Sequence, residues 1–88
     1  MRSRVYFMQD ASGDIKIGRS VNVRRRLRSF LTANPSIKLL VDIAGGARVE
    51  GNLHRRFAHL HTRREWFQSS SALLEFISRL QAEKHKRL

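Results

Sequence analysis

The chain has 88 residues, carries 18 Lys and Arg against 7 Asp and Glu, and contains no cysteine. This length fits a single domain, residues 1–88, and the lack of cysteine excludes disulfides and cysteine-bound zinc. A mean hydropathy of −0.45 without a long apolar run argues against a membrane span, and no signal-peptide pattern follows Met1. We therefore expect an intracellular location, either free in the cytoplasm or associated with the nucleoid.

The net charge of +11 indicates a polyanionic partner. Arginine supplies 14 of the 18 cations, and its planar guanidinium binds phosphate in bidentate geometry. The alternative is a GC-rich genome, which favours arginine codons without any binding role. We expect a nucleic-acid partner, DNA before RNA, and the sequence leaves the oligomeric state open.

Two short runs near the start of the chain alternate apolar and polar residues. The apolar members are Val5, Phe7, Ile15 and Ile17. Turn-forming residues 10–14 separate the runs, and so short a connection joins only antiparallel strands, which predicts a β-hairpin. Tyr6 and Lys16 then lie on the opposite face from these apolar residues and can share a site. The alternative is an ordinary strand tyrosine beside a solvated lysine.

The next segment predicts a helix that begins after Asn22 and ends at Asn34-Pro35. Its apolar stripe consists of Val23, Leu27, Phe30 and Leu31. At about 100° per residue, Arg25 and Arg28 lie away from this stripe, whereas Arg24 and Arg26 flank it near the sheet. Taken singly, each arginine is better explained as phosphate-steering or solvated than as catalytic.

A third strand and two further helices complete the predicted order β-β-α-β-α-α. Ile37, Leu39, Val41 and Ile43 alternate in the strand, which Gly45-Gly46 closes. The apolar stripe of the second helix consists of Val49, Leu53, Phe57 and Leu60, and the helical pattern fades over residues 61–64. The stripe of the third helix consists of Leu73, Phe76, Ile77 and Leu80. The predicted fold class is α+β, a three-stranded antiparallel sheet flanked by three helices, with a frayed tail at residues 82–88.

The second helix also places Glu50, His54 and His61 along one flank, which suggests metal binding or acid-base chemistry. A surface Glu-His pair worth a few tenths of a kcal/mol is the simpler explanation for an isolated pair. A zinc site that adds His59 is disfavoured, because His59 and His61 diverge on a helix. Trp66 and Phe67 are better explained as aromatics that close the core than as stacking partners for bases.

Short motifs in a fixed order resemble the GIY-YIG nuclease superfamily. They are Val5-Tyr6-Phe7, Ile15-Lys16-Ile17-Gly18-Arg19-Ser20, Arg26-Leu27, Asn34-Pro35, Glu50-x-x-Leu53-His54-x-x-Phe57 and Glu65-Trp66-Phe67. The resemblance is narrower to the phage and meiotically up-regulated gene branch, in which KIG replaces YIG. It spans Val5 to Ile77 and implies a metal-dependent endonuclease that hydrolyses phosphodiester bonds in nucleic acid. A catalytically inactive nucleic-acid-binding domain on the same fold is the alternative.

The resemblance also implies roles for individual residues. Tyr6 is the tyrosine of the first triplet, Lys16 replaces the tyrosine of the second, and Arg26 matches the helix arginine. Glu50 matches the metal-binding carboxylate, for Mg²⁺ or Mn²⁺, and His54 matches an accessory catalytic histidine. On this basis Tyr6, aided by Lys16 or His54, positions or deprotonates water, while Arg26 pairs with non-bridging phosphate oxygens.

Further arginines are expected to hold the nucleic-acid backbone: Arg19, Arg24, Arg25, Arg28 and Arg55. The sequence departs from the family pattern at Arg4, where the first triplet usually has glycine. It also lacks a clear equivalent of the late asparagine found in some family members.

Overall fold

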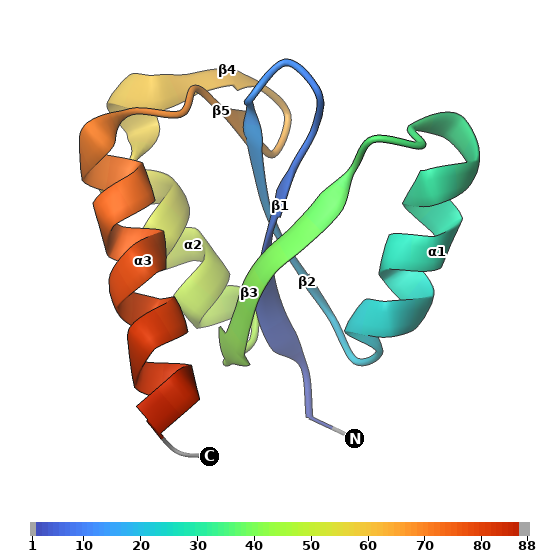
Figure 1. Cartoon of the computed structure of the whole chain (residues 1–88). Coiled ribbons are helices and arrows are strands. Elements are labelled where there is room, and N and C mark those ends of the chain that lie inside the picture. Colours follow the sequence, from blue (N-terminus) through green and yellow to red (C-terminus); the bar gives the residue numbers. More distant parts are fainter. Residues whose placement is uncertain (1, 87–88) are drawn as a thin grey trace.

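The computed structural model describes residues 2–86 as a five-stranded antiparallel sheet with helices on both faces (Figure 1). The elements are β1 (Arg4–Gln9), β2 (Ile15–Ser20), α1 (Val23–Ala33), β3 (Lys38–Ala44), α2 (Ala47–Arg56), a 3₁₀ turn η1 (Ala58–Leu60), β4 (His61–Arg63), β5 (Trp66–Phe67) and α3 (Ser71–Lys86). The strands lie in the order β3-β1-β2-β5-β4, and all neighbours pair antiparallel. None of the helices in this part of the chain combines the length and apolarity that crossing a bilayer requires.

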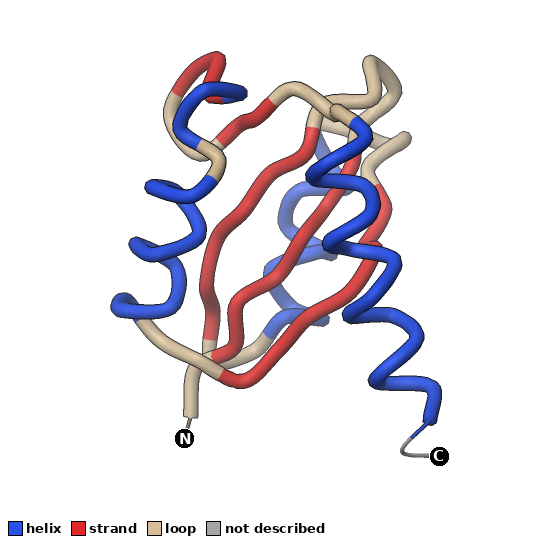
Figure 2. The backbone as a smooth tube through the Cα atoms, turned by 90° about the vertical axis from the view of Figure 1, so that its left-hand side faces the viewer, coloured by secondary structure: helices blue, strands red, loops and turns tan. Residues whose placement is uncertain are grey.

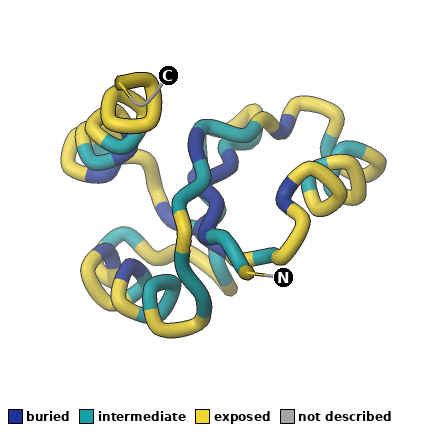
Figure 3. Tube along the Cα trace, turned by 90° about the horizontal axis from the view of Figure 1, so that it is seen from below, coloured by how far each residue is buried: buried dark blue, intermediate teal, exposed yellow. Residues whose placement is uncertain are grey.

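Strand β1 is buried on both of its faces. Val5, Phe7 and Met8 are 0% exposed and Tyr6 is 1% exposed, although alternate residues of a strand point in opposite directions. A strand that buries consecutive side chains needs a layer on each side of its sheet. Figures 2 and 3 show these layers, with α1 on one side of the sheet and α2 and α3 on the other.

Two hydrophobic clusters fill the spaces between these layers. The larger lies between the sheet and α2 and α3 and contains Val5, Phe7, Ile15, Ile17, Val41, Leu53, Phe57, Phe67, Leu73 and Ile77. The smaller lies against α1 and contains Tyr6, Met8, Val23 and Ile37, with Trp66 packed at its edge. The predicted parity of the hairpin is therefore confirmed, but the face that carries Tyr6 belongs to a second core.

The ends of α1 agree with the sequence prediction. The side chain of Asn22 accepts a hydrogen bond from the backbone N–H of Arg25 at 3.0 Å, which satisfies a donor that the first turn leaves free. The backbone N–H of Asn34 bonds to the carbonyl of Phe30 at 2.9 Å, and Pro35 follows directly. The side-chain cap of Asn22 thus marks the start of this helix, and Pro35 follows its end.

The α+β class is confirmed, but the predicted three-stranded sheet is wrong, because β4 and β5 extend it to five strands. Residues 61–64, predicted as the decaying end of the second helix, form β4 and a turn, and α2 already ends at Arg56. The exposed β4 shows no alternation of apolar and polar residues, and β5 has two residues. Neither strand therefore has a sequence pattern from which it could be predicted. Backbone pairing with Ile15 and Lys16 of β2 defines β5 instead.

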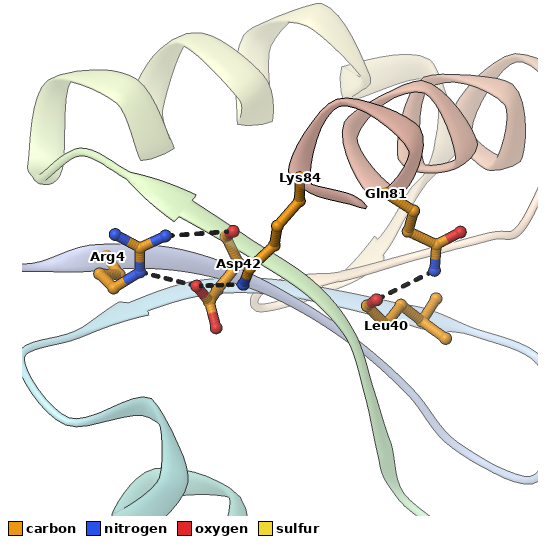
Figure 4. A network of polar contacts seen from close by, with 5 residues as sticks. All are labelled: Arg4, Leu40, Asp42, Gln81 and Lys84. Atoms are coloured by element: carbon orange, nitrogen blue, oxygen red, sulfur yellow. Dashed lines mark hydrogen bonds and ion pairs between the residues drawn. The ribbon is translucent and has the colours of Figure 1, made fainter. Parts of the chain in front are cut away.

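The C-terminal half of α3 is held against the edge strand β3 (Figure 4). Gln81 Nε2 donates to the carbonyl oxygen of Leu40 at 2.9 Å, and Lys84 Nζ lies 3.1 Å from Asp42 Oδ1. Arg4 Nε lies 2.6 Å from the same Asp42 oxygen. Residues 82–86, predicted to be frayed, form the last turns of α3, and residues 87 and 88 lie outside the described residues.

Truncating a core leucine should destabilise the fold far more than truncating its neighbour. Leu73 is 0% exposed and Leu74 is 41% exposed on the same helix. Leu73→Ala leaves a cavity in the larger cluster and should lower the free energy of unfolding by about 2 to 5 kcal/mol. Leu74→Ala is the matched control and should change it little, as measured by urea denaturation; equal losses would contradict the assignment of the core.

Asp42 should make the fold sensitive to acid. Burial raises the pKa of its carboxyl, but hydrogen bonds and charge attraction from Arg4 and Lys84 outweigh this and hold the pKa below its ordinary 3.8. The stabilisation is therefore complete above pH 3.8 and is lost as the pH falls through the folded-state pKa, because the unfolded chain binds the proton more readily.

Asp42→Asn should accordingly weaken the fall of unfolding free energy with decreasing pH and lower stability near neutral pH. Urea unfolding across the acidic range measures both effects. Asp14→Asn, in the β1–β2 turn, is the control and should keep the wild-type slope. An unchanged slope in Asp42→Asn would show that the ion pairs contribute nothing to folding.

Candidate functional site

A polar pocket of about 390 Å³ opens beside the first two strands. It is lined by Tyr6, Lys16, Arg19, Arg26, Phe30, Glu50 and Glu65, which come from β1, β2, α1, α2 and the β4–β5 turn. Strand β5 covers β2 at Ile15 and Lys16. Within the described residues, the second half of β2 therefore has a strand neighbour on the β1 side alone. Side chains from α1 and α2, on opposite faces of the sheet, reach one pocket at this notch.

Tyr6 projects from the smaller core into the pocket. Its ring packs edge-on against Phe30, with centroids 6.3 Å apart. Burial, followed by the negative charge of Glu65, raises the pKa of Tyr6 to about 12, even though Arg26 acts in the opposite direction. At neutral pH the phenol therefore keeps its proton and can both donate and accept a hydrogen bond.

Gly18 makes room for two of the polar groups in the pocket. It is the cross-strand partner of Tyr6 in the β1–β2 pair. A Cβ atom at Gly18 would lie 2.5 Å from the Tyr6 hydroxyl oxygen and 2.7 Å from Glu65 Oε2. Side-chain atoms do not approach so closely, so the absence of a side chain at this position lets the hydroxyl and the carboxylate face the same space.

Lys16 is held by aromatic rings. Its Nζ lies 4.9 Å from the centroid of the Phe30 ring and 5.4 Å from that of the Trp66 ring. Both contacts hold the ammonium group in place, because the negative face of an aromatic ring attracts a cation. Lys16 thus contributes a fixed positive charge to the pocket.

Glu50 enters the pocket from the first turn of α2 and forms an ion pair with Arg19. The distance from Arg19 Nε to Glu50 Oε1 is 3.3 Å, and the side chains are 49% and 17% exposed. An exposed pair of this kind is weak and can exchange partners. The sequence-predicted residues Tyr6, Lys16 and Arg26 therefore line the same pocket as Glu50.

His54 lies elsewhere. Its Nε2 is 2.8 Å from the carbonyl oxygen of Ile17, and its ring packs against Phe67 at a centroid distance of 5.1 Å, on the side of the larger core. It does not line the pocket. His61, expected on the same helix flank, lies in β4 instead, with Nε2 2.5 Å from the carbonyl oxygen of Arg64.

The arginines predicted to contact the nucleic-acid backbone are all exposed: Arg19, Arg24, Arg25, Arg28 and Arg55. Arg25 also lines a shallow neighbouring pocket that shares Arg26 with the main one. Arg55 on α2 donates to the side chain of Asn52. The exposed arginines Arg25 and Arg26 of α1 thus line the main pocket or the pocket beside it.

The prediction from sequence missed one pocket residue, Glu65. The residue appeared there only as the first member of the Glu65-Trp66-Phe67 motif, with no role of its own. A signal was available, because the chain has only 7 acidic residues and this one directly follows Arg63-Arg64. Only the hairpin of β4 and β5 brings it beside Tyr6.

The carboxylate of Glu50 is the pocket's candidate metal ligand. Within residues 2–86 no three His, Cys, Asp or Glu side chains gather as a metal-binding group. A single carboxylate suits Mg²⁺ or Mn²⁺, which keep several water ligands and take others from substrate phosphate, and does not suit a structural zinc site.

Comparison with known families agrees with this geometry. The T5orf172 domain matches residues 3–81, which is nearly the whole chain. The chain belongs to the T5orf172 domain family. This family is associated with nuclease-like domains that act on nucleic acid. No curated protein matches this T5orf172 domain, and neither does any solved structure.

Gly18→Ala should damage the pocket of this T5orf172 domain and lower its stability, because the added Cβ would displace Tyr6 and Glu65. The expected loss of unfolding free energy is about 1 to 3 kcal/mol, as for other overpacked positions. Gly51→Ala in α2 is the matched control.

A Cβ at Gly51 would meet only the flexible Arg55 guanidinium, at 3.5 Å, so this variant should be about 0.5 to 1 kcal/mol more stable than the wild type. Thermal unfolding of both variants measures the difference. A neutral Gly18→Ala variant would show that the space beside Tyr6 is not tight.

Proposed function

We propose that this T5orf172 domain is a metal-dependent endonuclease of the GIY-YIG type that hydrolyses phosphodiester bonds in nucleic acid, with DNA as the preferred substrate. The observation that carries the proposal is the convergence of Tyr6, Lys16, Arg26 and Glu50 on one pocket. Hydrolysis of a phosphodiester requires a positioned water, neutralisation of the negative charge on the phosphorane oxygens and stabilisation of the leaving oxygen. The pocket contains a residue type for each requirement.

Arg26 and Lys16 would bind the scissile phosphate. The guanidinium of Arg26 can donate hydrogen bonds to two non-bridging oxygens of the phosphate. The ammonium of Lys16 adds a positive charge whose position is held by two aromatic rings. Arg19 can also bind the phosphate when its ion pair with Glu50, at 3.3 Å, is broken. Positive charge that is already in place needs little reorganisation as negative charge develops on the phosphate.

Tyr6 would orient the attacking water. Its ring packs against Phe30, and the residue is 1% exposed and lines the pocket, so its hydroxyl can hold a water molecule in one position. A pKa of about 12 means that it does so as a phenol, not as a phenolate. Removal of the proton from water then needs another group.

Glu50 would hold Mg²⁺ or Mn²⁺. Its carboxylate faces the phosphate-binding residues and is held by Arg19 through an exposed, exchangeable ion pair alone. A divalent cation bound there would supply positive charge for the 3′ leaving oxygen. His54, bonded to the Ile17 carbonyl, would support the site by holding β2 in place beside Gly18.

A plasmid-nicking assay tests the function. Supercoiled DNA incubated with the wild-type domain and Mg²⁺ or Mn²⁺ should be converted to open circles, and Glu50→Ala and Arg26→Ala should each lower the rate by about 100-fold or more. Glu75→Ala and Arg79→Ala, exposed on α3, are controls of the same residue types and should keep the wild-type rate.

Two outcomes would count against the nuclease. Salt-sensitive gel shifts without nicking would favour the alternative, a catalytically inactive nucleic-acid-binding domain. Nicking that survives both Glu50→Ala and Arg26→Ala would place the activity outside this pocket or in a contaminant. A parallel reaction with single-stranded RNA tests the preference for DNA.

A further inference from the structure

Glu65 shares the pocket with the proposed catalytic residues, yet nothing above assigns it a function. Its Oε2 lies 2.7 Å from the point where a Cβ of Gly18 would stand, and the Tyr6 hydroxyl oxygen lies 2.5 Å from that same point. The two groups therefore face each other across the space that Gly18 leaves open. A water held by Tyr6 would lie within reach of the Glu65 carboxylate.

The backbone presents Glu65 in a fixed position. Arg64, directly before it, has a positive φ of 46°, an unusual conformation for a residue with a side chain. The backbone N–H of Ile17 donates to the carbonyl of Glu65 at 3.0 Å, and the His61 ring bonds to the carbonyl of Arg64. Strained conformations persist where the surroundings hold them, and they are frequent at functional sites.

The carboxylate of Glu65 is also free to react. Glu50 is paired with Arg19, whereas the Glu65 side chain forms no ion pair or hydrogen bond within residues 2–86. A half-buried carboxylate without a partner is costly unless a ligand or water uses it. Its position beside Tyr6 makes an attacking water the natural hydrogen-bond donor.

Other residues near the site are poorly suited to accept a proton from that water. Burial raises the pKa of Tyr6 to about 12, and the Nζ of Lys16 lies against the rings of Phe30 and Trp66, which hold it as a cation-π partner. His54 directs Nε2 at the Ile17 carbonyl oxygen and lies outside the pocket.

We propose that Glu65 is the general base of the reaction, an inference that rests on the nuclease function proposed above. The water oxygen forms a bond to phosphorus, and the water proton passes to the Glu65 carboxylate. The P–O3′ bond breaks, and the 3′ oxygen leaves with the bonding electrons and takes a proton from solvent. The products are a 5′-phosphate and a 3′-hydroxyl.

The charged and titratable groups around Glu65 fit this role. They are Tyr6 on β1, Lys16 and Arg19 on β2, Arg26 on α1 and Glu50 on α2. The cations offset the repulsion between the carboxylate and the phosphate, so a base and an anionic substrate can occupy one pocket.

Glu65→Gln removes the basicity and keeps the shape of the side chain. Single-turnover nicking with Mn²⁺ should slow by about 100-fold or more, as is usual when a general base is lost. DNA binding without metal, followed by fluorescence anisotropy, and Mn²⁺ binding, followed by calorimetry, should both stay at wild-type levels. Glu75→Gln on α3 makes the same chemical change at an exposed site and is the control.

Glu65→Ala provides a second test. Added formate should restore part of its nicking rate, because a small carboxylate can take the vacated place, and Glu75→Ala should show no such effect. Thermal unfolding of each variant shows that the fold is retained.

The outcomes separate this inference from the proposed function. If the wild type nicks DNA and Glu65→Gln nicks equally fast, the base assignment is overturned while the nuclease stands. If Mn²⁺ affinity falls together with the rate, Glu65 is a metal ligand and not the base. If the wild type does not nick with either metal, the nuclease proposal itself fails, and the base assignment fails with it.

Discussion

The burial of β1 on both faces is the constraint on which the rest of the structure depends. Val5 and Phe7 join the core under α2 and α3, while Tyr6 and Met8 join the core under α1. A domain of 88 residues can bury only a limited apolar surface. Its two small hydrophobic cores are built on opposite faces of the same central strand. The hydroxyl of Tyr6 can reach the pocket because its ring is anchored in the smaller core.

The shortness of β5 complements this constraint. A longer strand would cover all of β2, and its side chains would separate α1 from α2 at the sheet edge. With two residues, β5 pairs with the start of β2 only, so that Arg26 from one face and Glu50 from the other face meet at one pocket. The turn that leads into this short strand carries Glu65, so one local feature both opens the pocket and supplies a carboxylate.

The electrostatics of the pocket suit an anionic substrate. Lys16, Arg19 and Arg26 face Glu50 and Glu65, and the phenol of Tyr6 lies among them without charge. The exposed arginines of α1 extend the positive surface outward from this pocket. For the proposed nucleic-acid substrate, long-range attraction would come from these arginines, whereas the charges inside the pocket would determine where a phosphate binds.

The sequence predicts the strands and helices that have a clear apolar period, because alternation and capping residues are local signals. It also predicts that Tyr6 and Lys16 lie on the same face of the hairpin. Local signals do not reveal β4 and β5, which exist through pairing with β2, nor the end of α2 at Arg56. The sequence by itself therefore determined the main elements, the charge and most of the pocket residues. Only the tertiary structure decided that the sheet has five strands, that His54 lies behind β2 and that Glu65 stands beside Tyr6, because each depends on contacts between segments far apart in the chain.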